Sequence, residues 1–393
     1  MPHNLKARLG RIRTNAGTLS GVSPAASGGN KPDGLIPGEP QPDTVWPEWS
    51  EAGFKTLKRQ FNRELPFPLP QVFPAALAIL VPDIARLRRL PPAAELLFFD
   101  LETTGLSGGA GTVAFLAAFG RFTASAGLPG RIQITQYLLL DYPGEAAFIE
   151  SAVKEFAASG SPLVVSYNGK CFDSQIFKTR CLMNGITPPH YSHADLLHPA
   201  RRLWKRRLPD CSQSTIEVSV LGLDRSGDVS GAMAPDIWFS FLQSGCNREL
   251  LSICEHNARD ITGLAALFLA LGQIAESPLE SRAMFNVDEE SLALFWRQTL
   301  KKNPFLFQDT GSWCAETGEL LLKNAAESGH PRAAIAMAKI AEWRLGDMKK
   351  ALEYTDAALA APDISGSLRR ELETRRVRLE GKIARAGKGA MTE

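Results

Sequence analysis

The sequence predicts an α/β domain in which helices flank a mixed sheet, followed by a smaller all-α region. Apolar runs with the length of strands lie between residues 95 and 167, and Gly- or Pro-rich turns separate them. Helical patterns follow each later strand, and beyond about residue 280 only helical patterns remain. The 393 residues suffice for two or three domains, and 44% hydrophobic with 22% charged residues is typical of a soluble globular protein.

The predicted elements follow a fixed order along the chain. They are strands at 95–99, 112–122 and 132–140, a helix at 145–158, a strand at 162–167 and a helix at 173–183. Tight turns join the first three strands, which predicts an antiparallel meander. The Gly cluster at 105–111 lacks Gly-Lys-Ser/Thr and leads into a strand, so it does not indicate a nucleotide-binding P-loop.

Two carboxylates follow the first strand, at Asp100 and Glu102. Side chains at positions i and i+2 of a strand project from the same face. Carboxylates held side by side repel each other unless a cation lies between them. Oxygen ligands of this kind suit Mg²⁺ or Mn²⁺.

Further acidic residues arrive on later elements. Asp173 opens the helix at 173–183, where an N-cap role is an alternative or additional reading. His256 and Asp260 are four residues apart, so they share one face of the helix that continues through 262–271. Four carboxylates can hold two divalent ions that clamp the reacting oxygens of a phosphodiester, and a nearby His can take a proton from water.

With these residues in place, the chain resembles DEDD-type (DnaQ-like) exonucleases of the ribonuclease H-like superfamily, and in particular the YprB-type ribonuclease H-like domain family. The resembling segments are Phe99 to Leu106, Tyr167 to Asp173, His193 to His198 with Ala200 to Trp204, and His256 to Asp260. The resemblance implies a ribonuclease H-like sheet, with Asp100, Glu102, Asp173 and Asp260 as ligands of two Mg²⁺ or Mn²⁺ ions and His256 as the residue that activates water. His256 precedes the last Asp by four residues, whereas the His branch of the superfamily uses five and the Tyr branch four.

A basic stretch follows at 198–207 and contains no acidic residue. Cations around an aromatic residue suit phosphate contacts and base stacking. The equal alternative is a solvated amphipathic helix whose Leu203 and Trp204 pack inward. The candidate nucleic-acid-binding residues are Arg201, Arg202, Trp204, Lys205, Arg206 and Arg207.

Composition divides the chain into four parts. Residues 1–44 are rich in Gly, Pro, Ser and Asn and are expected to be a disordered arm. Residues 45–94 are expected to be an ordered lead-in that packs on the catalytic domain at 95–275. In the helical region at 276–390, a helix pair at 331–345 and 348–360 resembles a tetratricopeptide unit, which suggests a surface for a protein partner or a structural cap.

The six cysteines include no Cys-x-x-Cys pair, and their scatter indicates reduced thiols and a cytoplasmic location. No uninterrupted run of 18 apolar residues occurs, so we expect no membrane partner.

The favoured function is that of a metal-dependent nuclease acting on DNA or RNA as a 3′–5′ exonuclease. The alternative is a catalytically weak nucleic-acid-binding or scaffolding protein that recruits partners through its helical C-terminal region.

Overall fold

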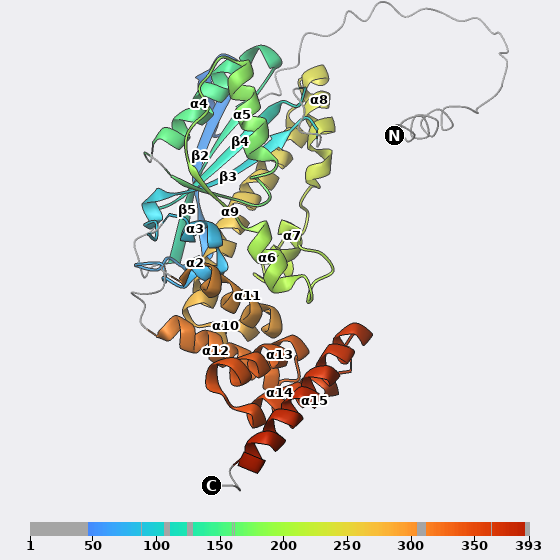
Figure 1. Cartoon of the computed structure of the whole chain (residues 1–393). Helices are drawn as coiled ribbons and strands as arrows, with labels where there is room; N and C mark the ends of the chain where they lie inside the picture. Colours follow the sequence, from blue (N-terminus) through green and yellow to red (C-terminus); the bar gives the residue numbers. More distant parts are fainter. Residues whose placement is uncertain are drawn as a thin grey trace, which may run out of the picture. The chain divides into compact units, whose positions relative to one another are not determined.

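The computed structural model describes residues 46–87, 89–105, 111–123, 129–158, 160, 162–304, 312–362 and 364–389, so the predicted arm at 1–44 lies outside the described residues. Its centre is a seven-stranded mixed sheet of order β1-β2-β5-β4-β3-β6-β7 (Figure 1), which confirms the predicted fold class. The strands are β1 Ser50–Gly53, β2 Thr56–Pro68, β3 Leu96–Thr103, β4 Ala114–Phe122, β5 Pro129–Leu139, β6 Leu163–Ser166 and β7 Ser192–Asp195.

Helices flank the sheet and form the C-terminal region. Those of the sheet domain are α2 Leu77–Leu80, α3 Pro82–Ala85, α4 Glu145–Ala157, α5 Asp173–Met183, α6 Leu197–Trp204, α7 Gln213–Ser219, α8 Ala234–Ser244 and α9 Arg248–Glu276. They are followed by α10 Pro278–Met284, α11 Glu289–Lys302, α12 Trp313–Glu327, α13 Pro331–Ile340, α14 Met348–Ala360 and α15 Gly366–Gly389. Short 3₁₀ turns lie at Ala93–Glu95, Tyr142–Gly144 and Gly231–Met233, and a π-helical segment at Ala341–Leu345.

The strand directions explain where the predicted site forms. β3, β4 and β5 are neighbouring antiparallel strands, as the meander prediction requires. β6 and β7 run parallel to β3. The carboxyl ends of β3 and β6 therefore lie at the same edge of the sheet, which brings the residues after each strand together.

Residues 45–94 contribute more than the packing lead-in that the sequence predicted, because β1 and β2 belong to the sheet. β2 pairs with β5 from Thr56 opposite Leu139 to Pro68 opposite Pro129. Leu57 and Leu65 face inward and are buried. Arg59 and Arg63 lie between them on the same face of the strand and are partly buried. Inward arginines interrupt the apolar alternation by which a strand is recognised.

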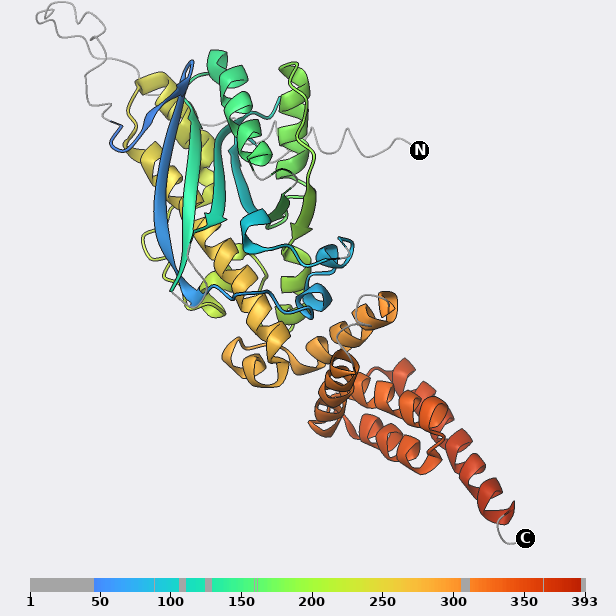
Figure 2. The ribbon, with the colours of Figure 1, turned by 90° about the vertical axis from the view of Figure 1, so that its left-hand side faces the viewer.

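Helices cover both faces of the sheet, with α4 and α5 on one side and α9 on the other (Figure 2). Alternation along β3 supplies both cores, since Phe98 joins the cluster with α9 and Phe99 joins the cluster with α4 and α5. α9 is long and apolar enough to span a membrane by length and composition alone, yet 78% of its apolar window is buried inside the protein. Such burial is what a core helix shows.

The predicted helix pair of the C-terminal region is present as α13 with its π-helical extension, followed by α14. Gly346 ends the first helix with φ +69°, a left-handed conformation that glycine adopts without steric cost. The Asp347 side chain then caps α14 by accepting the backbone N–H of Lys350 at 2.9 Å. The assignment of this helix pair as a tetratricopeptide unit stays a prediction.

Candidate active site

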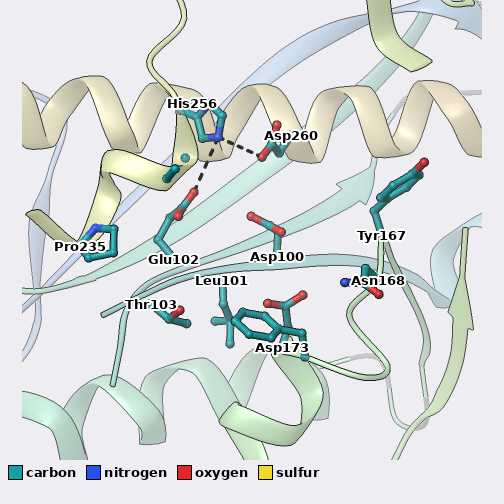
Figure 3. Close-up of a pocket in the computed structure, with 13 residues that line it drawn as sticks. Asp100, Leu101, Glu102, Thr103, Tyr167, Asn168, Asp173, Pro235, His256 and Asp260 are labelled. Atoms are coloured by element: carbon teal, nitrogen blue, oxygen red, sulfur yellow. Dashed lines mark ion pairs between the residues drawn. The ribbon is translucent and has the colours of Figure 1, made fainter. Parts of the chain in front are cut away.

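The four predicted carboxylates meet in one pocket of about 250 Å³ at the edge of the sheet (Figure 3). Asp100 and Glu102 come from β3, and Asp173 is the first residue of α5. His256 and Asp260 reach the pocket from α9, one helical turn apart.

Asp173 reaches the pocket because the loop after β6 turns very tightly. Asn168 adopts a left-handed conformation with φ +65°, and a Cβ at Gly169 would lie 2.5 Å from the Ser166 Oγ. The buried Asp195 carboxylate holds this loop by accepting the backbone N–H of Asn168 at 2.8 Å and of Lys170 at 3.2 Å. Asp195 therefore has a structural role, because it fixes the loop that carries Asp173 into the pocket.

Crowding and burial make the acids hard to ionise together. Burial, followed by the charges of Asp173, Asp260 and Glu102, raises the pKa of Asp100 well above its usual range. Burial and the neighbouring acids likewise raise the pKa of Glu102, and burial raises that of Asp173 to about 7. A divalent cation would relieve this repulsion and favour the ionised forms.

The tightest group in the pocket comprises Glu102, His256 and Asp260, whose potential ligand atoms all lie within 4.8 Å of one another. The His256 Nε2 lies 3.4 Å from Asp260 Oδ2 and 4.0 Å from Glu102 Oε1 (Figure 3). Its Nδ1 lies 3.0 Å from Asp228 Oδ2. The Asp228 carboxylate at Nδ1 orients the ring so that Nε2 faces the pocket.

Asp228 was not predicted as a site residue, because it lies in a polar Gly-containing turn with no motif around it. The Arg225 guanidinium holds it in place with an ion pair of 2.5 Å and also pairs with Asp260 and with the buried Glu217. Although burial acts against ionisation, the hydrogen bonds from Arg225 and His256 bring the pKa of Asp228 below its ordinary value. Glu217 fits beneath α9 only because residue 263 is glycine, where a Cβ would lie 1.8 Å from the Glu217 Oε1.

A second group missed by sequence reasoning connects β2 to Asp100 through the protein interior. Arg59 Nε donates to Gln136 Oε1 at 2.6 Å, and Gln136 Nε2 donates to Asn257 Oδ1 at 2.8 Å. Asn257 Nδ2 then donates to Asp100 Oδ2 at 2.7 Å. Gln136 Nε2 also donates to the Cys254 carbonyl at 2.8 Å, which prevents either amide from turning over. This chain of donors ends at Oδ2 of Asp100 and fixes the orientation of that carboxylate.

The structure separates the residues of the predicted basic stretch. Trp204 is fully buried and donates its Nε1–H to the Phe285 carbonyl at 2.8 Å, so the prediction that it stacks on bases is wrong and the inward-packing alternative holds. Arg206 and Arg207 lie beside Asp288, and Arg206 also pairs with the buried Glu290. These two arginines are engaged within the protein.

Of the remaining three cations, Arg201 and Arg202 are exposed on α6, and Lys205 is exposed directly after its last residue. Arg202 donates to the Gln298 side chain at 2.7 Å, and its guanidinium lies 4.7 Å from the Phe295 ring centre. Tyr167 lines the carboxylate pocket; burial raises the pKa of its hydroxyl, and the positive charge of Arg201 acts in the opposite direction.

Comparison with known families agrees with this geometry. Residues 97–271 match the model of the RNase_H superfamily, so the chain contains a domain of that superfamily with a nuclease-type fold. That domain is YprB-like, because the chain is 36% identical over 182 residues to the uncharacterized protein YprB of Bacillus subtilis (strain 168). The match covers 46% of this chain and 42% of the relative, so it spans less than half of the relative's length.

Two solved structures of nucleic-acid enzymes resemble part of the chain. Exonuclease I matches with a TM-score of 0.29 and 16% identity, over 50% of this chain and 44% of that chain. The family B DNA polymerase of the hyperthermophilic archaeon Pyrobaculum calidifontis matches with a TM-score of 0.33 and 15% identity, over 55% of this chain and 30% of the polymerase.

Proposed function

We propose that this protein is a metal-dependent nuclease that hydrolyses phosphodiester bonds of DNA or RNA from a 3′ end. The observation that carries the proposal is the convergence of Asp100, Glu102, Asp173 and Asp260 on one pocket inside an RNase_H-superfamily domain. Nucleic acid is then the substrate.

The donor set fits hard divalent cations. The four acids offer only oxygen ligands, and burial with mutual repulsion raises the pKa of three of them. A divalent cation that replaced the protons would relieve this repulsion. Asp100, Glu102, Asp173 and Asp260 would hold Mg²⁺ or Mn²⁺. Two such ions, when bound, would stabilise negative charge on the attacking and leaving oxygens of the phosphodiester.

The protein's own residues supply the proton chemistry. His256 Nε2 faces Glu102 and Asp260, where an attacking water would lose its proton to the imidazole. Asp228 at Nδ1 stabilises the imidazolium that this transfer produces and keeps the ring oriented. Asn257 orients Asp100 from the opposite side.

The test is cleavage of single- and double-stranded DNA and RNA, labelled separately at the 5′ and 3′ ends, with Mg²⁺, Mn²⁺ or EDTA. The wild type is compared with Asp100→Asn, which conserves the side-chain shape and removes a charge. We expect metal-dependent shortening from the 3′ end by the wild type and none by the variant. Cleavage that survives in a carefully purified Asp100→Asn protein would refute the proposal.

Absence of cleavage on every substrate, despite divalent-metal binding, would favour the scaffolding alternative. The cytoplasmic location that the sequence suggested stays a prediction.

A further inference from the structure

A groove lined by cations lies where α6 meets the C-terminal helices, outside the carboxylate pocket. Its first part, about 470 Å³, is lined by Arg202 of α6 and by Arg297 and Lys301 of α11. Its second part, about 650 Å³, shares Arg297 and Lys301 and adds Lys339 of α13. We refer to the surface around Arg202, Arg297, Lys301 and Lys339 as the basic groove.

Among the residues that the structure describes, acidic side chains do little to neutralise the charge of the basic groove. Glu319 is the acidic residue that lines it, and Glu319 already pairs with Arg344. Across the described ranges, the ion pairs include no carboxylate partner for Arg297, Lys301 or Lys339.

Arg297 is the most informative of these cations. It is partly buried, and its pKa is lowered with burial as the cause, because no acid compensates for the lost hydration. An unpaired, partly desolvated guanidinium is well suited to a bound anion.

The basic groove also offers an aromatic surface. Trp343, which follows Lys339 by one helical turn, lines the groove and is 66% exposed. The Arg375 guanidinium lies 5.4 Å from its ring centre. An exposed indole among cations is the combination that single-stranded nucleic acids bind, since phosphates contact the cations and bases stack on the ring.

Cations continue from the carboxylate pocket towards the basic groove. Tyr167 lines the pocket and donates its hydroxyl hydrogen to the Cys211 carbonyl at 2.6 Å. Arg201 and Arg202 are neighbouring exposed cations on α6, and Arg202 lines the groove. Continuity with a nuclease-type pocket favours nucleic acid over an acidic protein segment as the occupant.

We propose that the basic groove binds the phosphate backbone of a single-stranded nucleic acid whose 3′ end occupies the carboxylate pocket. This inference rests on the proposed function for its substrate. It predicts that long substrates bind more tightly than short ones, because only a long strand reaches from the pocket to α11 and α13.

The test measures binding without catalysis, so that it is independent of the cleavage assay. The full chain in EDTA is titrated into fluorescent oligo(dT) and oligo(U) of about 30 and about 6 nucleotides at several salt concentrations. The variant is Arg297→Gln/Lys301→Gln/Lys339→Gln. The matched control is Lys349→Gln/Arg369→Gln/Arg370→Gln, which removes the same charge from exposed positions of α14 and α15 that do not line the groove.

We expect the groove variant to raise the Kd of at least one long oligonucleotide by about tenfold or more. The magnitude of the slope of log K against log salt should fall by about 2, because each of the three lost phosphate contacts contributes about 0.7 for a single strand. The control variant should change the Kd less than about threefold, and cleavage of the short oligonucleotide by the groove variant should match that of the wild type.

Two results would overturn the inference. One is that the groove variant binds both long oligonucleotides with the same affinity and salt slope as the wild type, or that the control variant loses as much affinity as the groove variant. The other is that the wild type binds a polyglutamate peptide but neither oligonucleotide, and that the groove variant no longer binds the peptide. A failure of the proposed function looks different, since the wild type would then cleave nothing whether or not the groove binds.

Discussion

Asn257→Ala tests whether the buried donors behind Asp100 matter to the chemistry. The substitution removes the 2.7 Å hydrogen bond from Nδ2 to the Asp100 carboxylate, while Gln136 keeps its bond to the Cys254 carbonyl. A hydrogen bond to a charged group contributes about 1.5–3 kcal/mol. If this energy holds Asp100 in its reactive orientation, kcat should fall by about 10- to 150-fold.

The control for this prediction is Cys254→Ala. Cys254 is fully buried on the same helix, and only its backbone carbonyl contacts Gln136, so the variant creates a small cavity without removing a donor from Asp100. Both variants should lose stability, measured as the free energy of unfolding in urea, by about 1–3 kcal/mol. Only Asn257→Ala should lower kcat. Equal kcat values for the two variants would refute the reasoning.

Three further predictions concern the pocket and its surroundings. Asp228→Asn should lower kcat by about 10- to 100-fold and add little to His256→Ala in the double variant, because both act through one imidazole. In EDTA, the melting temperature should fall as pH rises from about 4 to 7, because folded Asp173, with a pKa of about 7, retains a proton that the unfolded chain has released. The increase in melting temperature on adding Mg²⁺ should grow over the same pH range. A melting temperature that does not change with pH would contradict this prediction. Arg206→Gln should lower the free energy of unfolding by about 1–3 kcal/mol, because it removes the cation beside the buried Glu290. Calorimetry measures this loss, and an unchanged stability would show that the ion pair is unimportant.

The sequence predicted the central meander and the two pairs of site residues, because strand alternation and helical spacing are local signals. The grouping of all four acids as one ligand set was implied by the family resemblance. Asp100 and Glu102 share a strand face, and His256 and Asp260 share a helix face, so short-range geometry alone places each pair.

The residues that were missed act through tertiary contacts. Asp228 lies 28 positions before His256 in a turn that has no pattern of its own, and Asn257 reaches Asp100 across 157 positions. β2 was missed because Arg59 and Arg63 occupy inward positions, where Arg59 donates to Gln136 and Arg63 pairs with Glu255. No sequence period encodes such pairings.

The position of β2 has a practical consequence for expressing fragments of this protein. A fragment cut to the family boundaries at 97–271 would lose β2 and leave the edge of β5 that faces β2 unpaired along almost its whole length, while the other edge stays paired with β4. An exposed edge of that length invites strands of other molecules to add to it, and such fragments are expected to aggregate. Fragments intended for crystallisation or enzymology should therefore begin before Ser50, where β1 starts, so that the native edge of the sheet is preserved.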